Sequence, residues 1–528
     1  MGCIQSKTTE HTEISVHGIP HAIECKETRI SKHIVLWNQY LVIRFLGSGA
    51  SGQVFLCMDI KTQSLVAIKC ICKGNGTSVP MEAQHLQVLK DAANIVPLRG
   101  ILYNVASSNT MIVMEYYGGG PVFDRKQMSL RHPVPEDVAR WYMRDIARGV
   151  MTLHAHGIIH GDLKLENMLI SCKGFIGLID LGSSKEFNGD DDTISSRKGG
   201  TPAFQAPEIL LQKGPYSGKA ADVYALGTCL YILLFSKTPY EADGISDLLH
   251  LMKQNGLDIP RHPWVSEEAR SLVKGLLEKN PQKRMTLEEV SKHDWMTDTG
   301  RLEPVCMEQK DACAEVCNVH DAFGAQSNSM AYAKGDRICV QGERTNGCIG
   351  IVLEGTVDIV SRGTVQDDTC RPSFSGELHV SNGGEWVHVG SHDGSTSSSS
   401  AYDAQRDDSI RAEVRNLETE IDMALEKLEQ IRFAGSMRGC QEEYVVERNA
   451  TLLGEAVFQP CIVPSTSHAY SAIASSKRTK VVWISSESFH KAMSSNASLH
   501  RTISLVRCRR RSTLDTIAGL CLVRDMIM

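Results

Sequence analysis

The sequence predicts an α+β fold with β-rich parts in both halves of the chain. Runs of β-forming residues at 40–46 and 54–58 flank a glycine-rich turn. A polar stretch at 160–167 is followed by short apolar runs, as expected for a hairpin that holds catalytic groups. Beyond residue 330, short alternating runs with glycine turns predict a second β-rich domain.

The glycine-rich turn reads Gly-Ser-Gly-Ala-Ser-Gly. Its glycines let backbone N–H groups close over phosphates, where a Cβ would collide. Alone, this pattern also fits a dinucleotide-binding turn, but that turn opens a helix and this one continues into a strand. We expect the nucleotide to be contacted by Leu46, Gly47, Ser48, Gly49, Ala50, Ser51, Gly52 and Val54.

The polar stretch carries the groups that phosphoryl transfer needs. Asp162 and Lys164 would serve the acceptor hydroxyl and the transferred charge. Asn167 and Asp180, which lies eighteen residues after Asp162, would hold magnesium. This reaction needs little covalent help beyond an in-line hydroxyl, metal-bridged phosphates and well-placed charges. The spacing therefore predicts phosphoryl transfer.

These motifs resemble those of the eukaryotic protein-kinase family, in the same order, across residues 37–297. The resemblance implies a bilobal protein-kinase fold with an antiparallel β small lobe, a mostly helical large lobe, and use of ATP and Mg²⁺. It implies that Lys69 aligns the α/β-phosphates and that Glu82, only thirteen residues further on, positions Lys69. A surface role for Glu82 is the alternative.

The resemblance also implies an adenine pocket. Ala67 would cover the base, Met114 would be the gatekeeper, and Glu115 and Tyr117 would belong to the hinge. Further along the chain, Arg284 would pair with Glu208, which closes the activation segment.

Two features imply transfer to serine and threonine of protein substrates. Lys164 follows Asp162 by two residues, and Gly200-Thr201-Pro202 has the serine/threonine form. The segment 188–196 resembles the calcium/calmodulin-dependent kinase kinases and their plant relatives, which implies other kinases as substrates.

Departures from the family pattern support a rival interpretation, a pseudokinase scaffold. Gly161 replaces the Arg of His-Arg-Asp, so the usual cation for an activation-loop phosphate is absent. The helix region of Glu82 is also short. Against the scaffold, every residue that the transfer needs is present.

Composition fits a multi-domain intracellular protein. The chain has 528 residues, 42% of them hydrophobic, and a net charge of −6, so neither wholesale disorder nor nucleic-acid binding is indicated. The longest apolar stretch, 229–235, is too short to span a bilayer. Because no secretory signal is visible, the seventeen cysteines are expected to be reduced thiols. No Cys/His quartet has zinc-ligand spacing.

The N-terminus predicts membrane attachment. Gly2 fits the myristoylation pattern and Cys3 beside it would take palmitate, a pair that gives stable anchoring. A chance match without modification is the alternative. We expect residues 1–36 to be a tether and the protein to occupy the cytoplasm and the cytoplasmic face of a membrane.

After a linker at 298–325, residues 326–510 are expected to form a β-roll that resembles the cyclic-nucleotide-binding domain family. Gly454 and Glu455 match its phosphate-binding cassette, but the cassette Arg falls near His468. A His cannot supply the planar fork of an Arg. We therefore expect a degenerate regulatory or docking domain and no tight binding of cyclic AMP or cyclic GMP. A cyclic-nucleotide-dependent kinase is the alternative.

An insertion at 365–440 interrupts this domain. Its first part, rich in Ser, Gly and Asp, is expected to be disordered. Residues 410–431 have apolar residues at alternating spacings of four and three. This pattern predicts either a coiled coil that forms a homodimer or an amphipathic helix packed on its own domain. Residues 511–528 are expected to be a C-terminal tail.

Overall fold

The computed structural model describes most of the chain. Glycine-loop residue Ala50, the acylation positions Gly2 and Cys3, and the cassette residues Gly454 and Glu455 lie outside the described residues. The described residues are 22–29, 34–49, 51–71, 80–90, 92–104, 109–122, 133–196, 199–211, 214–254, 256–261, 265–307, 329–339, 348–362, 380–382, 385–387, 417–432, 443–448, 450, 452–453, 471–485 and 497–527.

The small lobe is a sheet with the described strand order β1-β7-β8-β6-β5-β4-β3-β2. All its pairs are antiparallel except β1 with β7, which is parallel. Its strands are β1 (Ala22–Glu24), β2 (Glu27–Arg29), β3 (Val35–Trp37), β4 (Tyr40–Gly49), β5 (Gly52–Asp59), β6 (Ser64–Ile71), β7 (Leu98–Asn104) and β8 (Asn109–Glu115).

Two of these strands lie in the segment that the sequence predicts to be a tether. β1 adds to β7, and β2 pairs with β3, so part of 1–36 belongs to the sheet. The physical reason is apolar packing: Cys25 is buried in one cluster with Trp37, and Ile23 packs against that cluster.

Helix α1 (Met81–Val88) is the short helix expected near Glu82. It begins after Pro80, which is favourable where a helix starts, and the buried Leu86 packs into the core that extends through the large lobe. The helix has eight residues, which agrees with the short helix region that the sequence predicts.

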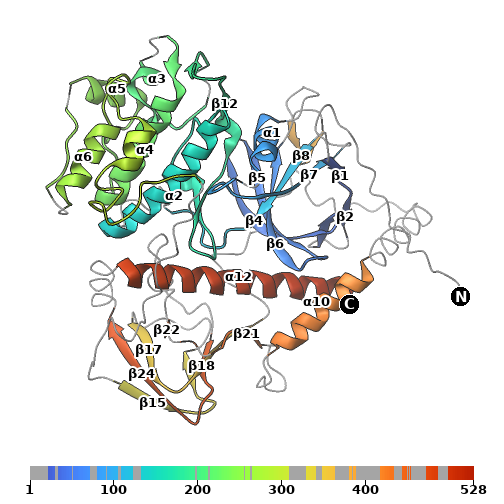
Figure 1. Cartoon of the computed structure of the whole chain (residues 1–528). Coiled ribbons are helices and arrows are strands. Elements are labelled where there is room, and N and C mark those ends of the chain that lie inside the picture. Colours follow the sequence, from blue (N-terminus) through green and yellow to red (C-terminus); the bar gives the residue numbers. More distant parts are fainter. Residues whose placement is uncertain are drawn as a thin grey trace, which may run out of the picture.

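The large lobe is mostly helical and is built around α4 (Figure 1). In the part of the chain that the structure describes, α4 alone has the length and apolar composition to cross a membrane, and 89% of it is buried inside the molecule. The helices are α2 (Glu136–Ala155), α3 (Pro207–Leu210), α4 (Gly218–Phe235), α5 (Ile245–Gln254), α6 (Glu267–Leu276) and α7 (Leu287–Lys292).

Short strands frame the catalytic loop between α2 and α4. They form three antiparallel pairs, β10 with β11, β12 with β9, and β13 with β14. Their bounds are β9 (Ile158–Ile159), β10 (Met168–Ile170), β11 (Ile176–Leu178), β12 (Lys185–Glu186), β13 (Thr193–Ile194) and β14 (Tyr216–Ser217).

The start of the predicted linker packs on the large lobe. Val305 is buried in the main core. Arg144 donates to the Glu303 carbonyl oxygen at 3.0 Å, and Arg148 donates to that of Cys306 at the same distance. Two buried guanidinium groups that donate to backbone carbonyls thus hold 303–306 in place.

The C-terminal region forms two four-stranded sheets, β15-β24-β17-β22 and β16-β23-β18-β21. Strands from before and after the insertion pair with each other, so the two pieces make one unit. The strands are β15 (Ser329–Ala333), β16 (Arg337–Cys339), β17 (Cys348–Glu354), β18 (Val357–Arg362), β21 (Glu443–Glu447), β22 (Leu452–Leu453), β23 (Ser471–Ala474) and β24 (Arg478–Ser485).

The described part of the insertion contains a hairpin and a helix. A hairpin of β19 (Val380–Asn382) and β20 (Glu385–Val387) lies in the part expected to be disordered. The sequence Gly383-Gly384 between the two runs is a two-residue hairpin signal. Helix α10 (Glu418–Ile431) has Ile421 and Leu428 in one cluster with residues of the C-terminal helix. Its apolar face is thus packed within its own chain, as in the second of the two interpretations.

The last element is α12 (Ala497–Ile527), which runs without interruption through position 510, where the sequence analysis placed a domain end. Its apolar residues Ile517 and Leu520 are buried and keep the helix continuous. Figure 1 shows α12, in red, lying between the catalytic part and the C-terminal sheets. One apolar cluster joins Leu41 and Met58 of the small lobe to α12 and to the sheets.

Candidate active site

Lys69 lies at the centre of the site. It stands on β6, opposite Val54 of β5. Its Nζ donates to both carboxylate oxygens of Glu82 at 2.7 Å and to Asp180 Oδ1 at 2.7 Å. Because Lys69 is 5% exposed, water screens these interactions weakly. The structure therefore brings the small-lobe lysine, the α1 glutamate and the large-lobe aspartate together.

Burial and charge act in opposite directions on the two carboxylates. Burial raises the pKa of Glu82, and the charge of Lys69 offsets this only in part. Burial also acts to raise the pKa of Asp180, but the charge and hydrogen bond of Lys69, and then the hydroxyl of Ser51, bring it below its ordinary value. Asp180 is therefore ionised near neutral pH, as a magnesium ligand must be.

The backbone of Asp180 is in the left-handed region, with φ of 66°. A non-glycine residue in this region is uncommon and is held there by its surroundings. Lys69 and Ser51 both bind its Oδ1, the latter at 3.1 Å. The strained turn directs the carboxylate toward the glycine-rich loop.

The glycine-rich loop joins β4 to β5, and Ser48 pairs there with Gln53. A Cβ added at Gly47 or Gly49 would meet no atom within 4 Å, so space for phosphates exists beside them. Gly52 differs: its φ is 143°, and a Cβ would lie 2.2 Å from the carbonyl oxygen of Cys70. Only glycine fits at that position.

The catalytic loop forms a closed set of hydrogen bonds around Asp162. Lys164 Nζ donates to Asp162 Oδ2 at 2.6 Å, and Thr201 Oγ1 donates to Asp162 Oδ1 at 2.7 Å. Lys164 also donates to Thr201 Oγ1 at 3.1 Å. Asn167 Nδ2 donates to the Asp162 carbonyl oxygen at 3.0 Å, which orients the amide. Thr201 was not among the predicted site residues, although its Gly-Thr-Pro context was the available signal.

Asp222 of α4 holds the catalytic loop in place by hydrogen bonds. Its carboxylate accepts the backbone N–H of His160 at 2.9 Å and of Gly161 at 3.1 Å, and it lies 2.9 Å from His154 Nε2. Burial acts to raise the pKa of Asp222, but the hydrogen bond and charge of His154 outweigh it and lower the pKa. The loop is thus attached to the core helix.

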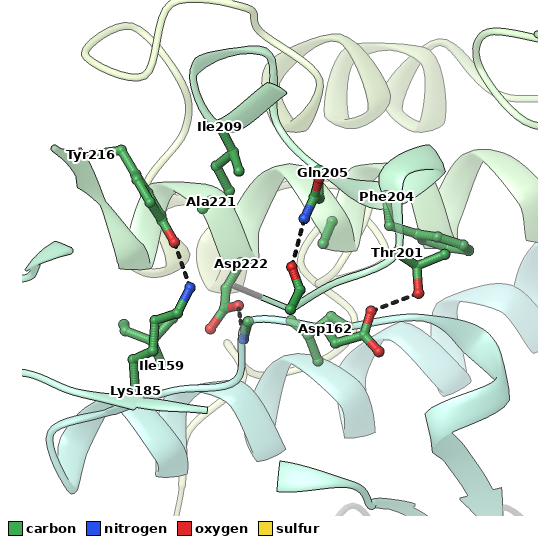
Figure 2. A pocket seen from close by; sticks show the side chains of 14 residues that line it. Ile159, Asp162, Lys185, Thr201, Phe204, Gln205, Ile209, Tyr216, Ala221 and Asp222 are labelled. Atoms are coloured by element: carbon green, nitrogen blue, oxygen red, sulfur yellow. Dashed lines mark hydrogen bonds between the residues drawn. The ribbon is translucent and has the colours of Figure 1, made fainter. Parts of the chain in front are cut away.

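A pocket lies beside Gly161, where the family usually has an arginine (Figure 2). Gly161 has φ of 76°, and a Cβ there would lie 2.6 Å from the Ser183 carbonyl oxygen. Lys185 lines the pocket and its Nζ donates to the Tyr216 hydroxyl at 2.7 Å. Burial lowers the pKa of Lys185. A lysine amine therefore lies here even though the arginine is absent.

The predicted adenine-pocket residues lie around the end of β8. Ala67 is paired with Met114, which is 7% exposed and packs into the core. Glu115 and Tyr117 follow directly, and Leu46 at the edge of the loop is 36% exposed. An exposed leucine beside an open loop offers apolar surface to a base.

Arg284 and Glu208 close the activation segment. The guanidinium makes two hydrogen bonds to the carboxylate, at 2.7 and 3.0 Å, in the bidentate geometry that favours Arg over Lys.

The described residues contain no group of three or more His, Cys, Asp or Glu placed to hold a metal ion. A magnesium ion at this site would take oxygens from Asp180 and Asn167 and complete its shell with phosphates and water. The depressed pKa of Asp180 and the oriented amide of Asn167 fit that role.

Comparison with known proteins agrees with this geometry. Residues 40–296 match the family described as protein kinase domain. The chain is 34% identical to serine/threonine-protein kinase GRIK2 of Arabidopsis thaliana, over 53% of this chain and 71% of the relative. It is 33% identical to GRIK1 of the same plant, over 51% and 69%. It is 35% identical to serine/threonine-protein kinase ssp1 of Schizosaccharomyces pombe, over 49% and 43%.

The chain belongs to the protein kinase family. It is a serine/threonine protein kinase that uses ATP and Mg²⁺. The matched region stops before the C-terminal sheets.

Proposed function

We propose that this protein transfers the γ-phosphoryl of ATP to serine and threonine of other proteins, protein kinases among them, at a membrane surface. The observation that carries the proposal is the assembled site: Lys69 bound to both Glu82 and Asp180, beside an Asp162 held by Lys164. A scaffold that does no chemistry has no need of this arrangement.

Each side chain has one role in this proposal. Asp162 orients the acceptor hydroxyl and takes its proton, while Lys164 stabilises charge on the transferred group. Asp180 and Asn167 hold magnesium, and Lys69 aligns the α/β-phosphates.

The first test is transfer of radiolabelled phosphate from ATP to a generic protein and to the kinase itself. Asp162→Ala should abolish transfer while leaving ATP binding intact. The matched control is Glu288→Gln, because Glu288 is exposed and pairs only with Lys292 on its own helix turn. If the wild type transfers no phosphate but still binds ATP, the pseudokinase scaffold is supported.

The proposal of kinases as substrates rests on the segment 188–196 and its resemblance to the kinase kinases. The test uses catalytically inactive protein kinases as acceptors, each with its activation-segment threonine intact or replaced by alanine. Labelling that depends on that threonine supports the proposal. Equal labelling of both forms contradicts it.

We further propose that the C-terminal unit is a cyclic-nucleotide-binding-like regulatory or docking domain. Support comes from its two four-stranded sheets, made from pieces on either side of an insertion. The expected result is that cyclic AMP and cyclic GMP leave the transfer rate unchanged, because His468 stands near the place of the cassette arginine. Activation by either nucleotide would instead favour the cyclic-nucleotide-dependent kinase.

Acylation at Gly2 and Cys3 would place the enzyme on the cytoplasmic face of a membrane, with a fraction in the cytoplasm. Gly2→Ala should move the protein to the soluble fraction of expressing cells, and Cys3→Ser should weaken attachment by removing one chain. Membrane attachment that is unchanged in both variants would contradict acylation. We propose no dimer through 410–431, because Ile421 and Leu428 pack within the chain.

A further inference from the structure

Two cysteines far apart in the sequence meet where α12 crosses the large lobe. Cys172 follows β10, at the turn into β11, and Cys508 lies on α12. Cys508 Sγ donates a hydrogen bond to Cys172 Sγ at 3.1 Å. Cys172 is half-buried and Cys508 is 1% exposed. Cys172 is therefore the more accessible thiol of the pair, and Cys508 lies within hydrogen-bond distance of it.

The surroundings of Cys172 stabilise its thiolate. Ser512, one helical turn after Cys508, has its hydroxyl 2.9 Å from Cys172 Sγ. The hydrogen bond from Cys508 acts most strongly and burial opposes it; Ser512, the Gly118 N–H and the charge of Arg509 then add to the lowering, and the pKa of Cys172 falls to about 6.

Two other cysteines of the chain have thiol pKa values that are raised, not lowered. Cys57 and Cys229 are fully buried, and burial raises the pKa of both thiols well above the ordinary value. Such thiols are inert packing groups. Cys172 differs because its neighbours donate hydrogen bonds to sulfur, and it has a second thiol within reach.

We propose that Cys172 and Cys508 form a peroxide-responsive dithiol whose oxidation fastens α12 to the catalytic domain by a disulfide. The Cys172 thiolate attacks one oxygen of hydrogen peroxide, the O–O bond breaks, and a sulfenic acid and hydroxide form. The Cys508 thiol then attacks the Cys172 sulfur, the S–O bond breaks, and water leaves. Overall, two thiols lose two protons and two electrons, and one peroxide becomes two waters.

The position of the pair gives the disulfide a structural effect. A Cβ added at Gly118, in the hinge, would lie 2.3 Å from Ser512 Oγ and 3.4 Å from the Cys508 carbonyl oxygen, so α12 lies directly against the hinge. In the reduced protein this contact depends on packing and hydrogen bonds. In the oxidised protein it is covalent, and opening of α12 away from the hinge is blocked.

The direct test uses the full chain treated with hydrogen peroxide, blocked with N-ethylmaleimide, and digested without reductant. Mass spectrometry should find a peptide pair joined through Cys172 and Cys508 that separates on reduction. Recovery of both cysteines as maleimide adducts, at peroxide levels that oxidise other cysteines of the chain, would overturn the proposal.

Two variants at one position separate reactivity from cross-linking. Cys508→Ser keeps a hydrogen-bond donor beside Cys172 but removes the second thiol, so peroxide should leave Cys172 as a sulfenic acid that dimedone traps. Cys508→Ala removes the donor as well, and alkylation of Cys172 by iodoacetamide should slow several-fold relative to Cys508→Ser. The exposed Cys306 is the internal reference for both rates. Equal rates in the two variants would show that Cys508 does not activate Cys172.

Hydrogen exchange measures the structural effect. Oxidation should slow exchange of α12 amides in the wild type and leave exchange unchanged in Cys508→Ser. Equal slowing in both proteins would mean that the cross-link does not hold the helix.

Discussion

Glu82 shows at the residue scale how a short connection can still build an active site. Glu82 lies only thirteen positions after Lys69, and α1 has eight residues. Both oxygens of the carboxylate nevertheless bind Lys69. A helix this short depends on tertiary packing rather than on its own propensity.

We predict that Glu82→Gln lowers kcat/KM for ATP by about 100-fold, because Lys69 loses the charge that positions it. Steady-state transfer rates at varied ATP would measure the change. Glu288→Gln serves again as the exposed control and should leave the rate unchanged. A Glu82→Gln enzyme with wild-type kinetics would remove the positioning role.

Asp222 should make stability depend on pH. Its pKa is lowered in the folded chain, so its stabilising effect is complete above the unfolded pKa of about 4 and is lost as pH falls through the folded value. We predict that Asp222→Asn costs about 2 kcal/mol or more at pH 7, since charged acceptors serve two buried backbone N–H groups. The cost should shrink below about pH 4. Urea unfolding at several pH values tests this, and a cost independent of pH would contradict it.

The sequence predicts those site residues whose type is fixed by the chemistry of phosphoryl transfer. Lys69, Asp162, Asn167 and Asp180 are recognisable because phosphates and magnesium require those groups at set spacings. The hydrogen bond from Thr201 to Asp162 is not recognisable in the sequence. The two residues are thirty-nine positions apart, and hydroxyl side chains occur at many kinds of position.

Among the helices and strands, α12 differs most from what the sequence predicts. The sequence predicts that the C-terminal domain ends at residue 510 and that a tail follows. In the structure Arg510 binds Glu447 of β21, and the apolar residues that follow pack against β4. Such long-range partners cannot be read from local periodicity. The same reason hides β1 and β2, whose three residues each are stable only because β7 and β3 are beside them.

We predict that Leu520→Ala destabilises the protein by about 2–5 kcal/mol, because Leu520 is fully buried and its removal leaves a cavity. The exposed Asp525 on the same helix is the control, and Asp525→Ala should change stability by less than about 0.5 kcal/mol. Thermal or urea unfolding compares them. Similar stability of the two variants would mean that α12 does not pack as described.

At the scale of the whole molecule, α12 connects the small lobe, the hinge and the C-terminal sheets. Arg44 of β4 makes two hydrogen bonds to Asp515, both at 3.2 Å, and the Tyr116 hydroxyl donates to the same carboxylate at 2.8 Å. Movement of the C-terminal unit must therefore act on the hinge.

A double-mutant cycle of Arg44→Ala and Asp515→Ala measures this connection. We predict a coupling of about 1 kcal/mol or more, because the two side chains are only 16% and 10% exposed. The exposed Glu288–Lys292 pair should give about 0.3–0.5 kcal/mol. Additive effects of the two substitutions would show that the helix and the small lobe are energetically independent.

The ends of the small-lobe sheet have a consequence for solubility. β1 and β2 are its outermost strands in the described part, each only three residues long, and they carry the charged Glu24 and Glu27. Short, charged border strands prevent two sheets from joining edge to edge. A shortened kinase beginning at residue 37, the boundary that motifs alone suggest, would lack both strands and most of β3, and would expose β7 and β4.

We predict that this shortened protein self-associates, whereas one beginning at residue 22 remains monomeric. Light scattering at matched concentrations distinguishes them, and equal behaviour would contradict the protective role. β1 and β2 thus protect this enzyme against aggregation as well as completing the small-lobe sheet.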